Sequence, residues 1–317
     1  MRVSKRLESW LLDGADPSVR YRVLTELLGR PSRDPAVVRA RKEIGRVGWA
    51  AGMLEEQHPG GQWDTPGSSG RELYRPKYIA TNWRLLVLSD LGVSGRNARV
   101  ARALAMFLRR MGGPKGGFGG RGSEVCFTGN AARMLVKFGR TDEPALRSSL
   151  DWLVRHQKKD GGWHCFRSRT GTLDGWEAMS AFAVLPPELR TPGIERSIAR
   201  GAEFYLDRGL LREGRAPYAP WLRLHFPAHY YYDYLVGLDF LSALGYGHDP
   251  RMRPVLDRLE ERRNSDGSWD LDAVHPDSDD PNYRPPGPMY PMWFEAPGRP
   301  SRWITTTALR VLQRAGR

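Results

Sequence analysis

Apolar residues recur with helical spacing along most of the chain, and glycine marks where these segments end. Leu146, Leu150 and Leu153, for example, fall on one face of a helix. Another apolar segment ends at Gly245 and is followed by Asp249-Pro250. Glycine directly after an apolar helix is typical of a C-cap, and proline is favoured in the first turn of the next helix. The pattern therefore predicts an all-α chain built from pairs of helices.

A second motif recurs between the pairs, a glycine-rich turn closed by an aromatic residue. Stacked helical hairpins bury their faces only against their neighbours, so such pairs form a solenoid or close into a ring. No shift in composition marks a second domain, and we predict one domain over 1–317, with a helical cap at 1–45 and an irregular flap at 270–302. The segments with the turn are Leu54–Trp63, Gly113–Phe118, Trp152–Trp163 and Leu259–Trp269.

The Gln-x-x-Asp-Gly-Gly-Trp turn at 157–163 resembles the repeat shared by squalene-hopene cyclases and the β subunits of protein prenyltransferases. The resemblance to this superfamily of terpenoid cyclases and prenyltransferases covers about residues 45–315. It implies an (α/α)6 toroid whose inner helices start at a central cavity that binds isoprenoids. It also implies structural roles for the turn residues Gln57, Trp63, Gln157, Trp163 and Trp269. Function is then expected at the starts of the inner helices, which we place at about 77–91, 124–138, 173–185, 229–244 and 301–314.

The net charge and the composition limit the classes of molecule that the protein is expected to bind. The chain has 49 basic and 36 acidic residues, a net charge of +13, which favours anionic ligands. The arginines are scattered and no basic-aromatic recognition motif is present, so we expect no nucleic acid partner. No apolar run is long enough to form a transmembrane segment, and only two cysteines are present, which excludes a disulfide framework. These features predict a cytoplasmic protein.

The first turns of the expected inner helices are unusually polar and aromatic. Buried polar groups need partners or a wet cavity, and a closed ring of helices leaves a cavity. We therefore predict that these residues bind the substrate, with aromatic faces against carbocation character and cations against an anionic head group. The predicted substrate-binding residues are Lys77, Trp83, Arg121, Asn130, Arg133, Trp176 and Tyr230.

The segment Gly116–Cys126 resembles the protein prenyltransferase segment that supplies a diphosphate-binding arginine and two zinc ligands. By this resemblance Arg121 takes the place of the arginine, and Glu124 and Cys126 take the places of an Asp and a Cys ligand. The segment departs from the family in being three residues shorter, and Glu replaces Asp. The resemblance implies His229 as a third ligand, with His225 and Tyr230 as competitors, and the turn before it offers Cys165. Zinc with Glu124, Cys126, Cys165 and His229 is predicted, against the alternative of a buried thiol and a capping histidine.

Two candidate acid-base groups remain. Asp277-Ser-Asp279-Asp280 matches the Asp-x-Asp-Asp motif of class II terpenoid cyclases, but Pro276 and Pro281 bracket it, and we expect a surface or flap loop. His229 and Asp233 are four residues apart, which predicts one helical face, with Tyr232 on the adjoining face. A carboxylate beside an imidazole suits a general base or a metal ligand. His229, Asp233 and Tyr232 are therefore the predicted catalytic residues, against the alternative of a structural polar network at a helix start.

The resemblance implies an isoprenoid-handling enzyme, a cyclase or prenyl transferase acting on a polyprenyl or prenyl-diphosphate small molecule. Two alternatives stay open. One is a non-isoprenoid α/α-toroid enzyme, a glycan lyase or hydrolase on an acidic substrate, and the other is a binding scaffold without chemistry. The protein prenyltransferases also require a second, different subunit, which one chain does not reveal.

Overall fold

The chain folds almost entirely into helices, as its periodicity predicts. The computed structural model describes residues 3–63, 73–74, 78–113, 115–119, 122–165, 168–212, 217–229, 231–274 and 294–317. Within these ranges the only strands are β1 (Asp270–Leu271) and β2 (Arg299–Pro300), which pair antiparallel. The all-α prediction is confirmed.

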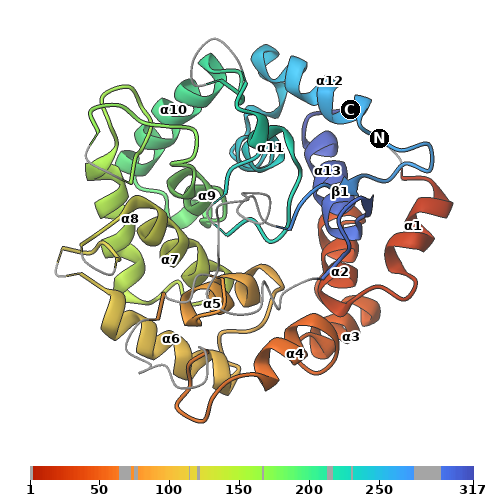
Figure 1. Ribbon diagram of the computed structural model, residues 1–317, viewed down its shortest axis with the longest axis horizontal. Helices are drawn as coiled ribbons and strands as arrows, with labels where there is room; N and C mark the ends of the chain where they lie inside the picture. Colours follow the sequence, from red (N-terminus) through yellow and green to blue (C-terminus); the bar gives the residue numbers. More distant parts are fainter. Residues whose placement is uncertain are drawn as a thin grey trace.

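The helices form an inner and an outer layer around the middle of the molecule (Figure 1). The inner helices are α2 (Pro17–Arg22) with the π-helical turn η1 (Val23–Leu27), α5 (Thr81–Asp90), α7 (Val125–Lys137), α9 (Glu177–Ala183), α11 (Tyr234–Ala243) and α13 (Arg302–Arg314). The outer helices are α1 (Lys5–Leu12), α3 (Pro35–Glu43), α4 (Gly48–Glu55), α6 (Ala98–Met111), α8 (Pro144–His156), α10 (Pro192–Asp207) and α12 (Arg253–Glu261). Short 3-10 turns lie at η2 (Pro187–Leu189), η3 (Ala219–Leu222), η4 (Tyr246–His248) and η5 (Pro250–Met252).

Contacts between neighbouring helices close into a circuit. Helix α7 packs against α5 and α9, α11 packs against α9 and α13, and α13 packs against α2, while α4 contacts both α2 and α5. Side chains join the first and last parts of the chain. Arg302 donates to the carbonyl oxygens of Trp10 (2.8 Å) and Asp13 (3.3 Å), and Arg22 donates to Thr307 Oγ1 (3.2 Å). The two ends of the chain therefore lie side by side (Figure 1).

The aromatic residues of the glycine-rich turns tie each outer helix to the next inner one. Each of three tryptophans donates its indole N–H to a carbonyl ten residues earlier, in or beside the preceding outer helix: Trp63 to Met53 (2.6 Å), Trp163 to Leu153 (2.9 Å) and Trp269 to Leu259 (2.7 Å). The backbone N–H of the aromatic residue in turn donates to a threonine of the following inner helix, each at 2.9 Å: Trp63 to Thr81, Phe118 to Thr128 and Trp269 to Thr305.

The glutamines of the turns bind the outer helix of the next helix pair. The side-chain amide of Gln157 donates to the carbonyl of Gly161 in its own turn and to the carbonyl of Ser197 in α10, both at 2.8 Å. Gln57 makes the same pair of bonds, to Gly61 and to Arg99 of α6, both at 2.9 Å. A half-buried amide that donates to both carbonyls ties the turn to the neighbouring outer helix.

Three inner helices begin later than their sequence pattern predicts. Helix α5 starts at Thr81 instead of 77, α9 at Glu177 instead of 173, and α11 at Tyr234 instead of 229. The start of α11 is set by Asp233, whose side chain accepts the N–H of Val236 as an N-cap. Residues 225–229 and 231–233 consequently lie outside the helix, and His229 has a positive φ of 47°. In the predicted flap, residues 275–293 lie outside the described residues.

Candidate functional site

A cavity of about 510 Å³ lies among the inner helices. Every inner helix contributes to its lining, from Arg22 beside η1 to Arg310 of α13. The lining includes the starts of α9 and α11 and the ends of α5, α7 and α13, so the cavity extends along the helices. Arg41 and Arg314 line it and are exposed, and the cavity therefore reaches solvent at the end where the inner helices finish.

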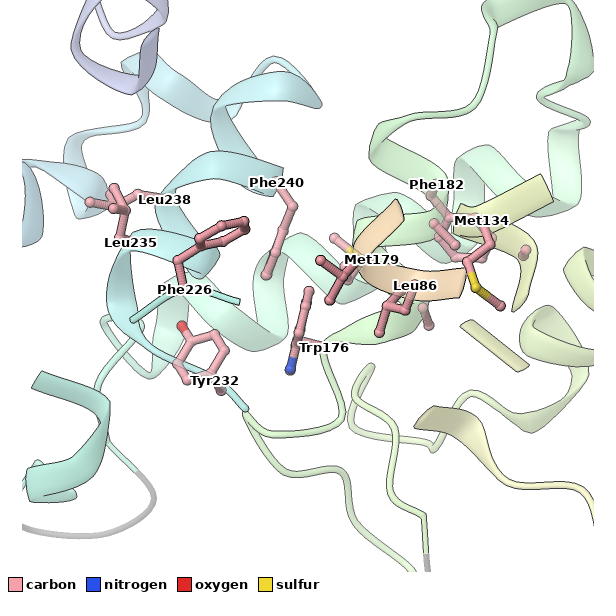
Figure 2. Close-up of a cluster of buried hydrophobic side chains, with 14 of the residues drawn as sticks. Leu86, Met134, Trp176, Met179, Phe182, Phe226, Tyr232, Leu235, Leu238 and Phe240 are labelled. Carbon is pink, nitrogen blue, oxygen red and sulfur yellow. The ribbon is translucent and has the colours of Figure 1, made fainter. Parts of the chain in front are cut away.

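The end near the helix starts is aromatic and apolar. Trp176, Phe226 and Trp303 line it together with Leu235 and Phe240. Phe226 and Trp303 are stacked, with ring centroids 4.0 Å apart. Figure 2 shows Trp176, at the start of α9, together with Phe226, from the segment before α11, and Phe240 of α11. Such a surface suits the apolar part of a ligand.

His225 and Asp233 form a buried pair at this end of the cavity. Nδ1 of His225 lies 2.6 Å from Oδ2 of Asp233, and both side chains are only 1% exposed. The same oxygen accepts the backbone N–H of His225 at 3.1 Å. A carboxylate accepts the proton on Nδ1, which leaves Nε2 of neutral His225 as a proton acceptor. Nε2 has no hydrogen-bond partner among the described residues, and His225 lines the cavity. This arrangement is that of an oriented general base.

Two buried arginines line the middle of the cavity, and each lies over a tryptophan. The guanidinium carbon of Arg22 is 4.1 Å from the ring centroid of Trp303, and that of Arg133 is 5.4 Å from that of Trp176. Both residues line the cavity, and each is more than nine-tenths buried. Within the described part of the chain, Arg22 Nη1 and Arg133 Nε have no acceptor. Buried donors are almost always satisfied, so these two atoms point to a bound water or ligand.

Asp90 pairs with Arg133 and with a second cation of the lining, Lys137. Asp90 Oδ1 lies 2.6 Å from Lys137 Nζ and 3.4 Å from Arg133 Nη1. Burial alone would raise the pKa of Asp90, but the two cations outweigh it and lower that pKa below its ordinary value. Burial lowers the pKa of Lys137, and Asp90 opposes that shift. The carboxylate is therefore ionised at neutral pH.

A second charged network lies where the cavity meets solvent. Arg310 donates to Asp239 Oδ2 at 2.6 Å and also binds Glu26, while Arg314 lies 3.1 Å from Asp239. Burial would raise the pKa of Glu26, but Arg22 and Arg310 lower it to about 2. The charged side chains of the whole lining are basic Arg22, Arg41, Arg133, Lys137, Arg310 and Arg314 and acidic Glu26, Asp90, Asp233 and Asp239. The cavity therefore carries more cations than anions.

The structure separates His229 from Asp233. We predicted one helical face for the two residues, and this is wrong because α11 begins only at Tyr234. His229 is fully buried and packs against the rings of Tyr78 and Trp83, with centroid distances of 5.3 and 5.4 Å. Burial lowers the pKa of His229 to about 3, so its imidazole is neutral. The imidazole that Asp233 binds belongs to His225.

The other predicted substrate and catalytic residues fall into three groups. Arg133 and Trp176 line the cavity. Tyr232, Trp83 and Asn130 are buried in its surroundings, where they donate to the carbonyls of Leu210 (2.9 Å), Tyr74 (2.8 Å) and His229 (3.3 Å) respectively. Lys77, Arg121, Tyr230 and the Asp277–Asp280 motif lie outside the described residues.

The two cysteines lie together at the start of α7. The backbone N–H of Cys126 donates to Sγ of Cys165 at 3.3 Å, and Sγ of Cys126 is 3.8 Å from Oε2 of Glu124. Within the described ranges, no three His, Cys, Asp or Glu side chains form a group that could hold a metal ion. The predicted zinc set is thus not assembled among the described residues, and we derive no chemical step from zinc.

Glu177 is a buried acid to which the sequence analysis gave no role. It is fully buried at the start of α9, and neither carboxyl oxygen has a hydrogen-bond partner within the described ranges. Burial raises the pKa of Glu177 well above its ordinary value of 4.5, and nearby Cys165 adds to the shift. The buried surroundings therefore favour the protonated carboxyl group of Glu177.

Comparisons with known proteins give distant structural likenesses only. No family model and no curated protein matches the chain. Among solved structures, a protein from Actinoplanes is 19% identical with a TM-score of 0.47, over 97% of this chain and 92% of that chain. The type II terpene cyclase MstE from Scytonema is 16% identical with a TM-score of 0.31, over 84% of this chain and 95% of that chain. Likenesses with TM-scores below 0.5 assign no activity.

Within the residues that the structure describes, no helix has both the length and the apolar character needed to cross a membrane.

Proposed function

We propose that the chain is an (α/α)6-toroid enzyme of the terpene cyclase and prenyltransferase type. It binds an anionic, amphipathic isoprenoid in the central cavity and passes a proton through His225. One observation carries the proposal. Arg22, Arg133 and His225 line one cavity, and each has a buried polar atom (Nη1, Nε and Nε2 respectively) without a hydrogen-bond partner among the described residues. Two cationic donors and one proton acceptor in this position fit an anionic substrate with an exchangeable proton.

The cavity accommodates both parts of such a substrate. Its volume of about 510 Å³ is within the range of roughly 300–1,000 Å³ that small-molecule sites occupy. The apolar chain would lie against Trp176, Phe226 and Trp303, and the anionic group would accept hydrogen bonds from Arg22 and Arg133. Charged hydrogen bonds of arginine to carboxylate or phosphate are stronger than neutral ones, and burial strengthens them further.

His225 would act as the general base. Asp233 holds the proton on Nδ1, so Nε2 can take a proton from the bound substrate. The imidazolium formed in this step is stabilised by the carboxylate 2.6 Å away. Both side chains are only 1% exposed, so the surrounding residues shield the pair from bulk solvent.

Measurements of ligand binding and of turnover separate the binding role of Arg22 and Arg133 from the proton transfer by His225. Geranylgeranyl diphosphate binding would be followed by tryptophan fluorescence, because Trp176 and Trp303 line the cavity. Arg22→Met and Arg133→Met should each weaken binding at least about tenfold, the loss of one charged hydrogen bond. Arg196→Met, at an exposed position of α10, is the matched control. His225→Gln should bind normally and form no product when prenyl substrates are incubated and analysed by mass spectrometry. If all four variants bound the diphosphate as tightly as the native protein does, the proposal would be refuted.

An acidic glycan is the second candidate substrate. The excess of basic side chains in the lining and the His225–Asp233 pair would also serve a lyase or hydrolase acting on uronate polymers. Incubation with uronate oligosaccharides distinguishes the two, because cleavage there and no binding of prenyl diphosphate would select the glycan enzyme. A scaffold without chemistry is favoured by a cavity filled with its own side chains, whereas this cavity retains about 510 Å³.

Zinc is a separate proposal, which rests on the resemblance of the Glu124–Cys126 segment. Elemental analysis of the purified protein distinguishes zinc from free thiols at this place, because close to one zinc per chain, lost in Cys126→Ala, would establish zinc. Metal-free protein with full activity would remove zinc from the proposed function.

A further inference from the structure

Cys126 and Cys165 are brought together by the fold although they lie 39 residues apart in sequence. Cys165 follows the turn that ends in Trp163, and Cys126 lies in the first turn of α7. The backbone N–H of Cys126 donates to Cys165 Sγ at 3.3 Å. The pair lies outside the cavity lining and takes no part in the proposed reaction.

We infer that Cys126 and Cys165 are a redox-sensitive dithiol, which a hydroperoxide oxidises to an intramolecular disulfide. In the first step one cysteine sulfur bonds to the terminal oxygen of the hydroperoxide, the O–O bond breaks, and the alcohol or water leaves with a proton. In the second step the other sulfur attacks the resulting sulfenic acid, the S–O bond breaks, and water leaves with the second thiol proton. Two thiols are oxidised, and one hydroperoxide is reduced.

The geometry places the sulfurs within reach of this bond. An N–Cα bond is about 1.46 Å long, so Cα of Cys126 lies within about 4.8 Å of Cys165 Sγ. In a disulfide the two Cα atoms are about 4.4–6.8 Å apart. Since Cys165 Sγ already lies against the backbone of Cys126, rotation of the side chains is the movement that brings the two sulfurs together. Both cysteines are partly exposed, so a small peroxide can reach them.

The chain contains no other cysteine, so the test can count thiols directly. The full-length protein would be reduced, freed of reductant and treated with an equimolar amount of hydrogen peroxide. We expect free thiols to fall from two to none per chain and the intact monomer to lose the mass of two hydrogen atoms. Dithiothreitol should reverse both changes. Peptide mapping should then recover one cross-linked peptide containing both cysteines.

Single variants exclude other products. Cys126→Ser and Cys165→Ser should each stop at a sulfenic acid on the remaining cysteine, which dimedone traps. Three results would overturn the inference: two thiols that persist after peroxide, a covalent dimer on a non-reducing gel, or thiols that react only after a chelator removes a metal ion.

Discussion

Oδ2 of Asp233 binds Nδ1 of His225 at 2.6 Å, while Oδ1 of the same carboxylate accepts the N–H of Val236 at 2.8 Å. One side chain therefore starts helix α11 and orients the imidazole at the cavity. The two roles are separable, because an asparagine retains an oxygen for the helix start but has no negative charge for the histidine.

This relationship predicts different outcomes for two substitutions of Asp233. Asp233→Ala removes the helix cap and should lower the free energy of unfolding by about 1–2 kcal/mol. Asp233→Asn should lower it less, because asparagine is an equally good N-cap. Both variants should lose most of the turnover. Urea unfolding and product analysis measure the two effects, and equal stability of the variants would show that the cap contributes little.

Glu177→Gln should change how stability depends on pH. The pKa of Glu177 is raised in the folded protein, so the folded state holds the proton more tightly than the unfolded state does. The contribution of Glu177 to stability is complete below its ordinary pKa of 4.5 and is lost as the pH rises through the folded value. The uncharged glutamine lacks this loss. Urea unfolding from about pH 5 to pH 9 should therefore show the variant gaining on the native protein as the pH rises. A constant difference would mean that Glu177 is ionised in the folded state.

Asp90→Asn should be strongly destabilising, since it leaves Arg133 and Lys137 beside each other without their shared carboxylate. Removing one partner of a buried ion pair costs about 3–5 kcal/mol. Lys137→Met in the same chain should recover part of the loss, which a double-mutant cycle in urea measures. The pKa of Asp90 is lowered in the folded protein, so its contribution is present above the ordinary value of 3.8 and is lost as the pH falls below it. Additive effects at neutral pH would contradict this coupling.

Two glycines in helices should respond oppositely to alanine. A Cβ on Gly129 of α7 would lie 2.5 Å from the backbone carbonyl carbon of Glu177, so Gly129→Ala should force α7 and α9 apart and cost about 1–3 kcal/mol. A Cβ on Gly52 of α4 would have nothing within 4 Å, and Gly52→Ala should stabilise the protein by up to about 1 kcal/mol. Thermal unfolding compares the two, and a neutral Gly129→Ala would indicate looser packing between α7 and α9.

The helix pairs are predictable from sequence because their signals are local. Glycine caps, Asp-Pro starts and apolar spacing all act within a few residues, and the structure confirms the helical class. The sequence places the start of α11 too early, at His229. His229 and Asp233 are four residues apart, and this spacing fits a helix that contains both residues as well as a helix that begins only after Asp233. Only the conformation of residues 225–229 and 231–233 decides against that interpretation, and it has no repeating pattern.

The cavity was less predictable, since its contacts join distant residues. Arg22 meets Thr307 across 285 residues, and no local periodicity links them. His225 and Asp233 are eight residues apart in a segment without regular structure, so their pairing has no spacing rule. Arg133 and Trp176 were found because they belong to inner helices whose ring arrangement the turns suggest.

The closed circuit of helix contacts has a consequence for how such a chain can change its length. In a linear array of helical repeats, a terminal pair can be gained or lost while the rest stays folded. Here α2 covers a flank of α13, and Arg22 lies against Trp303. Deleting the first pair would therefore expose apolar surface on the last one as well as on its sequence neighbour. Loss of one helix pair would therefore remove packing from two neighbours at once, so the number of pairs is harder to change than in a linear array.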